Sequence, residues 1–567
     1  MSDSTVGANN IRPNFTNTEK GEHYSPLQNT VQSQKKQFFD TVLTFFALAI
    51  SVYFLISCCV HHEISGYIRP EQQITAVFNS NQLFIPYLYQ DIFIHHAPWS
   101  DWILSPVPFL FPDGLIFFII VSIFRNIVLS IFLANAALAI SYYILLVSIG
   151  TAVCGKHCKN LFRFSAFLSL MLACGHLHDH EIIIPLWSSH FGATVVIYLG
   201  CFRLILELLN NATIIKKYFY YTLLSALIFF TSLSDPFFFV LLLGTIPAAL
   251  LALALHKKIR SSFMLGLFLL LVFIGGIAFL CNFYDLLNLH IRSFIHLKAN
   301  TAPLFHFTLA SFTVLHKMLA LYYAHNPIII FLSFSYIFIG LALFFFRSTQ
   351  NTPTLFITIS VSFCILTTLF LTLFFDQDLL HPNFLSLRHF QPALLLPAFL
   401  CFPIFLAHSN FIIQVSHQYY RFFLFILISC LFLFQPYDSP QQMLGVYPTL
   451  TRCIDHYAKQ GQLLNKNGIS EYWDAHINDM LSKQHINIVA INRYKKPYNW
   501  MSTKHDYQNK KFHFILVREP TFSADTVIQY WGQPNSILIC PYADNYRIFV
   551  YNEGFYIDSH TKLKTKT

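Results

Sequence analysis

Residues 234–260 read SDPFFFVLLLGTIPAALLALALHKKIR, and this stretch decides the class of fold. From Pro236 to Leu255 the chain carries no charged residue. A helix that crosses the hydrocarbon core of a bilayer needs about 20 mainly apolar residues, so this segment is long enough to span a membrane. The basic residues that follow it are typical of the cytoplasmic end of a span.

The composition of the whole chain agrees with this segment. Of its 567 residues, 55% are hydrophobic, 17% are aromatic and only 11% are charged. A soluble domain carries about a quarter charged residues, so much of this surface must contact lipid, and a wholly water-soluble enzyme is excluded. The net charge of +9 comes mainly from short basic clusters between apolar segments, which indicate topology and not a nucleic-acid-binding face. We therefore expect the lipid bilayer as a partner, and no nucleic acid.

Eleven apolar segments have lengths that suit membrane spans, so the expected fold class is mainly α, a polytopic helical membrane protein. A polar tail at 1–38 precedes the membrane domain at 39–435, and an α+β soluble domain at 436–567 follows it. The predicted spans are 39–60, 127–152, 161–176, 191–210, 218–235, 236–255, 262–281, 327–346, 354–375, 393–409 and 419–435.

Basic residues in the short loops predict the orientation. Lys35, Lys156, Lys216, Lys257 and Arg347 fall on alternate loops of the eleven-span map. Because cytoplasmic loops carry the excess of Lys and Arg, the map places the N-terminus in the cytoplasm and the C-terminus outside. The expected location is the inner (cytoplasmic) membrane, with a long first outer loop at 61–126.

The regions outside the spans have their own predicted structure. In the first outer loop, Leu83–Tyr89 and Gly114–Phe124 are too short to span and are expected to lie on the membrane surface as helices. Cys453 and Cys540 of the soluble domain could form a disulfide on the outer side. Strands are expected there at Ile486–Ile491, Phe512–Val517, Ser536–Cys540 and Tyr546–Tyr551, with helices at Thr449–Gln460, Ser470–Ser482 and Ala524–Trp531.

Ionisable residues near the ends of spans are functional candidates, because their burial is costly. Here the acidic ones gather on the outer side, at Asp91, Asp101 and Asp113 in the first loop and at Asp235 between two spans. A carboxylate there could act as a general base on an acceptor hydroxyl or stabilise an oxocarbenium-like sugar centre. The alternatives are an interfacial position for Asp101 and helix N-capping for Asp113 and Asp235.

Two other outer segments carry ligand-type side chains. His178, Asp179 and His180 are weak candidates for a divalent metal ion, because neighbours in one loop rarely converge on one ion. Arg388 and His389 precede the tenth predicted span, where they suit a lipid phosphate or anchor the span at the interface. The sequence identifies no cofactor beyond this candidate metal ion.

Several short motifs occur in this layout, namely Tyr89-Gln-Asp91, Trp102, Phe111-Pro-Asp113, Ser234-Asp235-Pro236, Arg388-His389-Phe390 and Glu471-Tyr472-Trp473. With the long first outer loop and the outer C-terminal domain, the chain resembles an uncharacterised bacterial branch of the GT-C class of polytopic glycosyltransferases. The resemblance implies transfer of a sugar from a polyprenyl-phosphate donor to a cell-envelope acceptor at the outer face. It implies Asp91 as the base, Arg388 as the phosphate ligand, and a donor or acceptor pocket at Asn79, Asn81, Trp102 and Asp113.

Two other functions stay open. The first outer loop has Asn79 and Asn81 where related chains often have Asp, which favours a catalytically inactive envelope scaffold. The other alternative is a transporter or flippase for a lipid-linked substrate. The sequence shows neither an internal inverted repeat nor a pair of Gly/Pro-broken spans, which are the features typical of such transporters.

Overall fold

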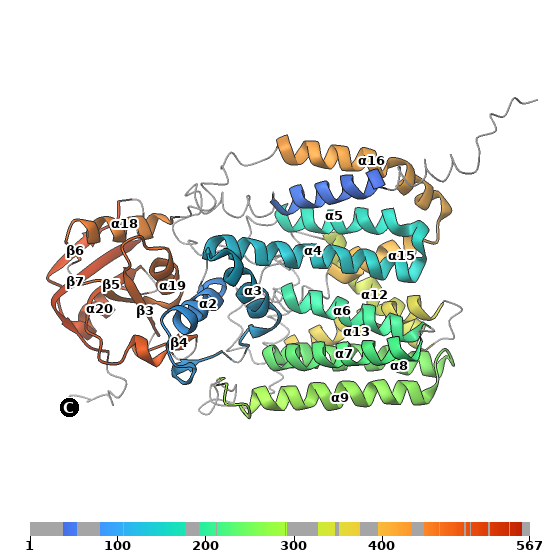
Figure 1. The fold of residues 1–567 in the computed structure, drawn as a ribbon, viewed down its shortest axis with the longest axis horizontal. Coiled ribbons are helices and arrows are strands. Elements are labelled where there is room, and N and C mark those ends of the chain that lie inside the picture. Colours follow the sequence, from blue (N-terminus) through green and yellow to red (C-terminus); the bar gives the residue numbers. More distant parts are fainter. Residues whose placement is uncertain are drawn as a thin grey trace, which may run out of the picture.

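The computed structural model describes residues 38–53, 80–105, 107–175, 192–210, 213–289, 291, 327–345, 351–374, 395–433, 447–463, 465–492, 495–498, 501–519, 522–541, 543 and 545–557. A bundle of long helices forms its larger part, and a smaller domain containing a β-sheet lies at one end of that bundle (Figure 1). Helices of the first outer loop lie between the two.

Five helices in the described ranges are long and apolar enough to cross a membrane. The finding confirms a mainly helical protein of membrane type, but five clear spans are fewer than the eleven predicted. The five are α4 (Ile127–Cys154), α8 (Pro236–Leu255), α9 (Ser261–Phe283), Thr352–Phe370 within α13 (Thr352–Phe374), and Asn410–Cys430 within α16 (Asn410–Leu433).

Within the described residues, the other predicted spans do not meet this criterion of length and apolarity. Arg203 and Glu207 lie within α6, and two lysines follow the first residues of α7. The predicted span at 393–409 contains the π-helix η6 (Pro397–Cys401) and the short α15 (Phe402–Leu406), because proline cannot donate to the helical ladder. The remaining bundle helices are Phe38–Tyr53, α5 (Lys159–Gly175), α6 (Gly192–Leu209), α7 (Ile214–Ser234) and α12 (Pro327–Phe345).

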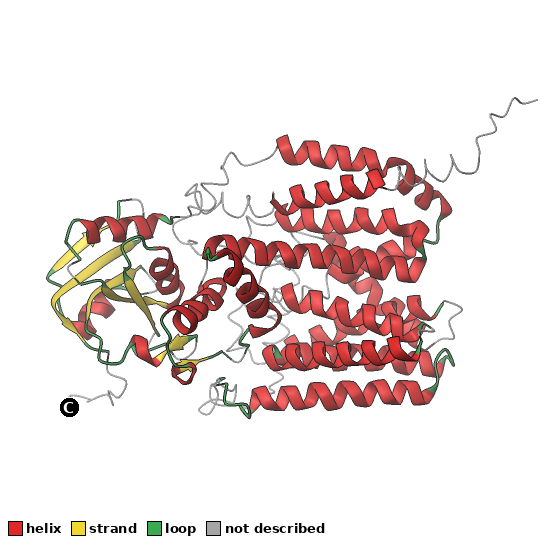
Figure 2. Ribbon diagram, in the orientation of Figure 1, coloured by secondary structure: helices red, strands yellow, loops and turns green. Residues whose placement is uncertain are grey.

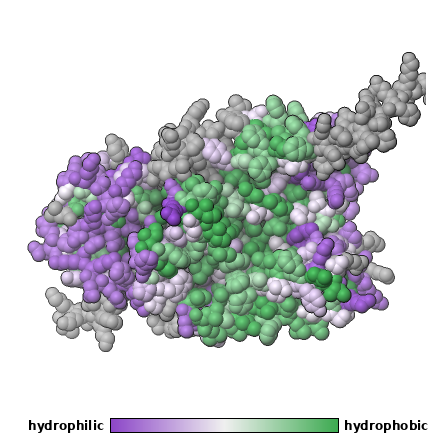
Figure 3. Space-filling model, in the orientation of Figure 1, coloured by the Kyte–Doolittle hydropathy of each residue, from purple (hydrophilic) through white to green (hydrophobic). Residues whose placement is uncertain are grey.

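The helix that decided the class of fold is one of the more buried helices of the bundle. Within an apolar segment of 18 residues in each helix, the buried share is 56% in α8 and 67% in α13, against 22% in α9 and 17% in α16. α8 packs against α13, and a Cβ at Gly244 would lie 2.1 Å from Thr367 Oγ1. A residue without a side chain is needed for helices to approach this closely. On the face that Figure 3 shows, the bundle is mostly apolar along its length, whereas the sheet domain is mostly hydrophilic.

The C-terminal domain contains a five-stranded mixed sheet (Figure 2). The strand order is β3-β2-β5-β7-β6, with β2 parallel to β3 and β5, and β7 antiparallel to β5 and β6. The strands are β2 (Asn467–Glu471), β3 (Asn487–Ile491), β5 (Phe512–Arg518), β6 (Ser536–Ile539) and β7 (Tyr546–Phe555), and the helices are α18 (Thr449–Lys459), α19 (Tyr472–Leu481) and α20 (Ala524–Trp531).

The four predicted strands are confirmed, but a fifth, β2, was missed. The helix predicted over 470–482 begins only at Tyr472, because β2 pairs with β3 on one side and with β5 on the other. Asn and Gly are depleted in strands, so the sequence did not favour a strand here. Gly468 is required because a Cβ would lie 2.2 Å from the Phe514 ring.

The predicted disulfide is also formed. Cys453 of α18 is bonded to Cys540, directly after β6, with the two Cα atoms 5.7 Å apart.

The first outer loop packs differently from its prediction. In α2 (Ser80–Tyr89), Leu83, Phe84 and Leu88 are fully buried, and the helix packs against α19 of the C-terminal domain. A position on the membrane surface is therefore wrong for α2, because its apolar face is covered by protein. The loop continues through the π-helix η2 (Gln90–Ile94), the 3₁₀ turn η3 (Trp99–Asp101), β1 (Trp102–Ile103), η4 (Leu110–Gly114) and α3 (Leu115–Phe124).

Candidate functional site

Asp91 lies in η2, directly after α2, and only 5% of it is exposed. The indole Nε1 of Trp102 donates a hydrogen bond of 2.7 Å to Asp91 Oδ2, and Trp102 itself is fully buried. His95, one turn further, has Nδ1 3.8 Å from Asp91 Oδ1. The indole N–H therefore satisfies one oxygen of this buried carboxylate, as a buried charge requires.

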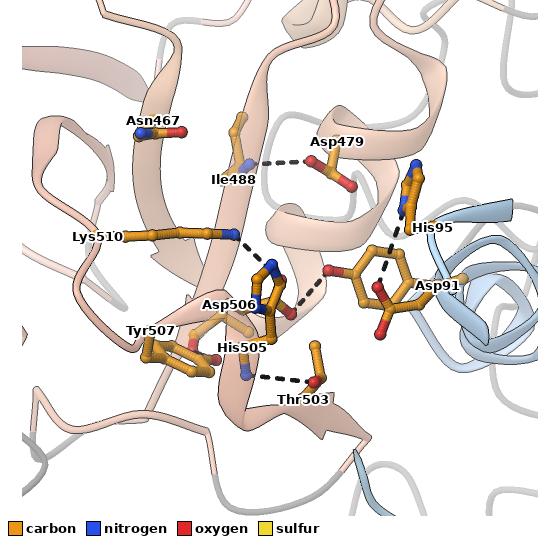
Figure 4. A network of polar contacts seen from close by, with 12 residues as sticks. Asp91, His95, Asn467, Asp479, Ile488, Thr503, His505, Asp506, Tyr507 and Lys510 are labelled. Carbon is orange, nitrogen blue, oxygen red and sulfur yellow. Dashed lines mark hydrogen bonds and ion pairs between the residues drawn. The ribbon is translucent and has the colours of Figure 1, made fainter. Parts of the chain in front are cut away.

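The C-terminal domain contacts this part of the loop through backbone and side chains. β1 pairs with β4 (Ser502–Thr503), and the Met501 amide donates to the Ile103 carbonyl at 2.7 Å. The Tyr87 hydroxyl donates to Asp506 Oδ2 at 2.8 Å, and its ring centroid lies 4.7 Å from that of His476. Figure 4 shows Asp91, Asp506 and Asp479 within one network of polar contacts.

Burial shapes the charges in this interface. It raises the pKa of the Asp506 carboxyl to about 6, against the opposing positive charge of Lys510, whose Nζ lies 3.7 Å from Asp506 Oδ1. Burial also raises the pKa of Asp479, although the Ile488 amide donates to this carboxylate, and the charges of Asp506 and Asp91 add to the rise. The pKa of the His476 imidazole is lowered to about 4 by the same cause. The interface thus disfavours charge of either sign.

A second group of polar side chains lies at the end of the bundle that faces the first outer loop. Asp235 caps α8: its Oδ1 accepts from the Phe237 amide at 3.1 Å and its Oδ2 from Thr194 Oγ1 at 2.8 Å. Asp235 is 4% exposed. The Asn282 amide group donates to the Leu233 carbonyl at 2.7 Å, which ties the end of α9 to the turn before Asp235.

The first outer loop meets the bundle at the same turn. The Phe111 amide donates to Ser234 Oγ at 2.9 Å, directly before Asp235. Asp113 lies two residues after Phe111 and is 5% exposed. The backbone is extended at Phe111 and helical from Pro112 onward, so Asp113 lies in the first turn of this helix and not at its N-cap. The helix dipole favours a carboxylate in that turn. Two buried carboxylates from distant parts of the chain are thus placed near one contact.

The other predicted site residues lie apart from these two groups or outside the described residues. Asp101 is half-buried in η3, and Asn81 lies in α2 with its side chain outside the described part. Asn79, His178, Asp179, His180, Arg388 and His389 all lie outside the described residues. Among the residues that the structure describes, no three His, Cys, Asp or Glu side chains come together in a way that could hold a metal ion.

Three residues of this region were missed by the sequence analysis. Thr194 and Asn282 hold the turn at Asp235, and Asp285, just after α9, has a buried Oδ1 with no hydrogen-bond partner among the described residues. A polar residue in the last turn of an apolar helix, as at Asn282, is a signal that could have found one of them.

No known family model matches this chain, and none of the curated proteins searched matches it.

Proposed function

We propose that this chain is a membrane-embedded glycosyltransferase of the GT-C type. It would transfer a sugar from a polyprenyl-phosphate donor to a cell-envelope acceptor, at the face of the membrane where the C-terminal domain lies. The proposal includes the eleven-span topology with a cytoplasmic N-terminus in the inner membrane.

The observation that carries the proposal is the pair of buried carboxylates at the end of the bundle. Asp113 and Asp235 come from the first outer loop and from the α7–α8 turn, and the bond from the Phe111 amide to Ser234 Oγ joins these segments. Ionisable side chains buried at the rim of a membrane domain are functional candidates, because burying them there is costly. The capping bond from the Phe237 amide engages Oδ1 of Asp235, and the Thr194 hydroxyl engages Oδ2.

In the proposed reaction, the acceptor hydroxyl oxygen forms a bond to the anomeric carbon while the bond from that carbon to the phosphate oxygen breaks. The carrier phosphate leaves with the bonding electron pair, and a carboxylate takes the proton of the hydroxyl. We assign this proton to Asp235, which Thr194 and the Phe237 amide orient. Asp113 would line the pocket, and Arg388 and His389 would bind the carrier phosphate.

Asp91 is the weaker candidate for the base, although the resemblance favours it. Its hydrogen bond from Trp102 and its place against the C-terminal domain give it a structural role. This observation favours the scaffold alternative if Asp235 proves dispensable.

The test measures release of polyprenyl phosphate, the product common to every sugar, from a panel of polyprenyl-phosphate sugars with envelope extract as acceptor. The full chain is reconstituted in nanodiscs. Asp235→Asn is expected to lower the rate at least 100-fold, in the range for loss of a general base. The matched control is Asp525→Asn on the exposed start of α20. Wild-type rates in both Asp235→Asn and Asp113→Asn would refute the proposal.

A further inference from the structure

Helix α3 exposes an apolar face although it belongs to a loop outside the bundle. Its ten residues include no charge, and its one hydroxyl, Ser122 Oγ, donates within the helix to the Phe118 carbonyl at 2.7 Å. Leu115, Ile119 and Ile123 form an exposed stripe at a spacing of four residues, with exposed fractions of 47%, 54% and 68%. The opposite face packs against α4.

The end of η2 extends this apolar face. The Phe93 ring centroid lies 5.7 Å from that of Phe118, so η2 and α3 pack side by side. Phe93 and Ile94 are 55% and 54% exposed. We call the surface formed by Phe93, Ile94, Leu115, Ile119 and Ile123 the apolar wedge.

The apolar wedge is continuous with the helical bundle. Only Arg125 and Asn126 separate the end of α3 from α4, one of the five helices that can span a membrane. The last wedge residue, Ile123, is therefore four positions from the first residue of a candidate membrane span. Soluble surfaces rarely expose contiguous apolar patches of this kind. The exposed polar residues follow its ends, His95 after η2 and Arg125 after α3, as in helices that lie at the boundary between head groups and acyl chains.

We propose that the apolar wedge inserts into the acyl-chain region of the leaflet nearest the C-terminal domain and holds the first outer loop at a fixed depth. Lipid chains are thus its partner, and the loop is attached to the membrane at its middle as well as at its ends.

The wedge also fixes the depth of two carboxylates. Asp91 precedes Phe93 by two residues, and Asp113 precedes Leu115 by two, so both lie next to the inserted side chains. They are thereby held close to the level of the head groups, where a lipid-linked donor presents its phosphate. This last consequence rests on the proposed function, whereas the insertion itself does not.

The test adds one tryptophan at a time to the full chain in nanodiscs, as Phe93→Trp and Ile123→Trp. Lipids brominated on their acyl chains quench tryptophan only on contact, and the emission of the parent chain is subtracted. The control is Tyr530→Trp, which replaces an aromatic residue that is 50% exposed on α20 of the C-terminal domain. We expect the added emission to be largely lost at both wedge positions and unchanged at the control.

Two results would overturn the proposal. Quenching of the wedge tryptophans by aqueous iodide, to the extent seen for Tyr530→Trp, would show that the wedge faces water. Protection from both quenchers would show that protein covers it. Each variant must first unfold at the same temperature as the parent protein. Ile119→Trp replaces a wedge variant that does not. Because the readout needs no turnover, insertion can hold even if the sugar-transfer assay is negative.

Discussion

The buried bond between Trp102 and Asp91 gives the most specific prediction for the interface of the first outer loop with the C-terminal domain. Trp102→Phe keeps an aromatic ring in the site but removes the indole N–H that donates to Asp91 Oδ2 at 2.7 Å. The carboxylate, 5% exposed, then loses its donor. We expect the interface to open more often, because an unsatisfied buried charge is costly.

The magnitude follows from the second substitution, Asp91→Asn. Hydrogen bonds to charged groups contribute about 1.5–3 kcal/mol, and bonds between neutral groups about 0.5–1.5 kcal/mol. Asn keeps the shape of Asp and still accepts from the indole, and the loss of charge relieves repulsion from Asp479 and Asp506. We therefore expect a small effect of Asp91→Asn alone. In that background Trp102→Phe should cost about 1.5 kcal/mol less than in the wild type, which is roughly tenfold in an equilibrium constant.

Hydrogen exchange at the Met501 amide measures this coupling. That amide donates to the Ile103 carbonyl across the interface, so its exchange reports separation of β1 from β4. The four chains of the cycle are compared as full-length protein in nanodiscs at one pH. Equal loss of protection from Trp102→Phe in both backgrounds, within about 0.5 kcal/mol, would refute the structural role of the bond. Loss of sugar transfer in Asp91→Asn with protection intact would instead support Asp91 as the base.

Two further predictions concern the C-terminal domain. Replacing Cys453 and Cys540 together by Ala removes a cross-link between positions 87 residues apart. The loop-entropy model gives such a cross-link a stabilisation of about 4–5 kcal/mol. The temperature of thermal unfolding of the domain should therefore fall, while replacing the free Cys430 by Ala should leave it unchanged. Asp506, whose pKa burial raises from 3.8 to about 6, contributes stability that is fully present below pH 3.8 and is lost as the pH rises through 6, at most about 3 kcal/mol. The contribution of His476, whose pKa is lowered to about 4, increases over the same pH range and opposes that of Asp506. The test therefore compares the stability of Asp506→Asn with that of the wild type between pH 4 and 6, and the variant should lack the part of the loss that Asp506 causes. Identical pH profiles of the two proteins would contradict the prediction.

Much of the fold could be predicted because hydrophobicity and strand patterns are local properties. The α8 segment is recognisable from twenty residues without charge, and Phe512–Val517 from its branched and aromatic side chains. β2 was missed because its residues have low strand propensity and its stability comes from pairing on both sides. The position of α2 was wrong for a related reason, since an apolar helix face fits a protein partner or a membrane equally well.

For the candidate site, the sequence predicted which acidic residues stand out but not which residues they contact. Asp91, Asp113 and Asp235 stand out in sequence because carboxylates are rare in an apolar chain. Their partners do not stand out: Thr194 and Asn282 resemble many other polar residues near helix ends. No local pattern reports that Thr194 lies within 2.8 Å of Asp235.

The sequence by itself determined that the protein is mainly helical with apolar helices that could cross a membrane, that a sheet domain follows them, and which acidic residues require an explanation. These conclusions follow from composition and periodicity, which can be read from a single segment. The tertiary structure decided which of the polar side chains come into contact. Tyr87 and Asp506 are bonded although 419 positions apart, and Asp91 faces the C-terminal domain while Asp235 stays with the bundle. The physical reason is that a buried polar group takes its partner from whatever packing brings within about 3 Å, and packing depends on the whole chain.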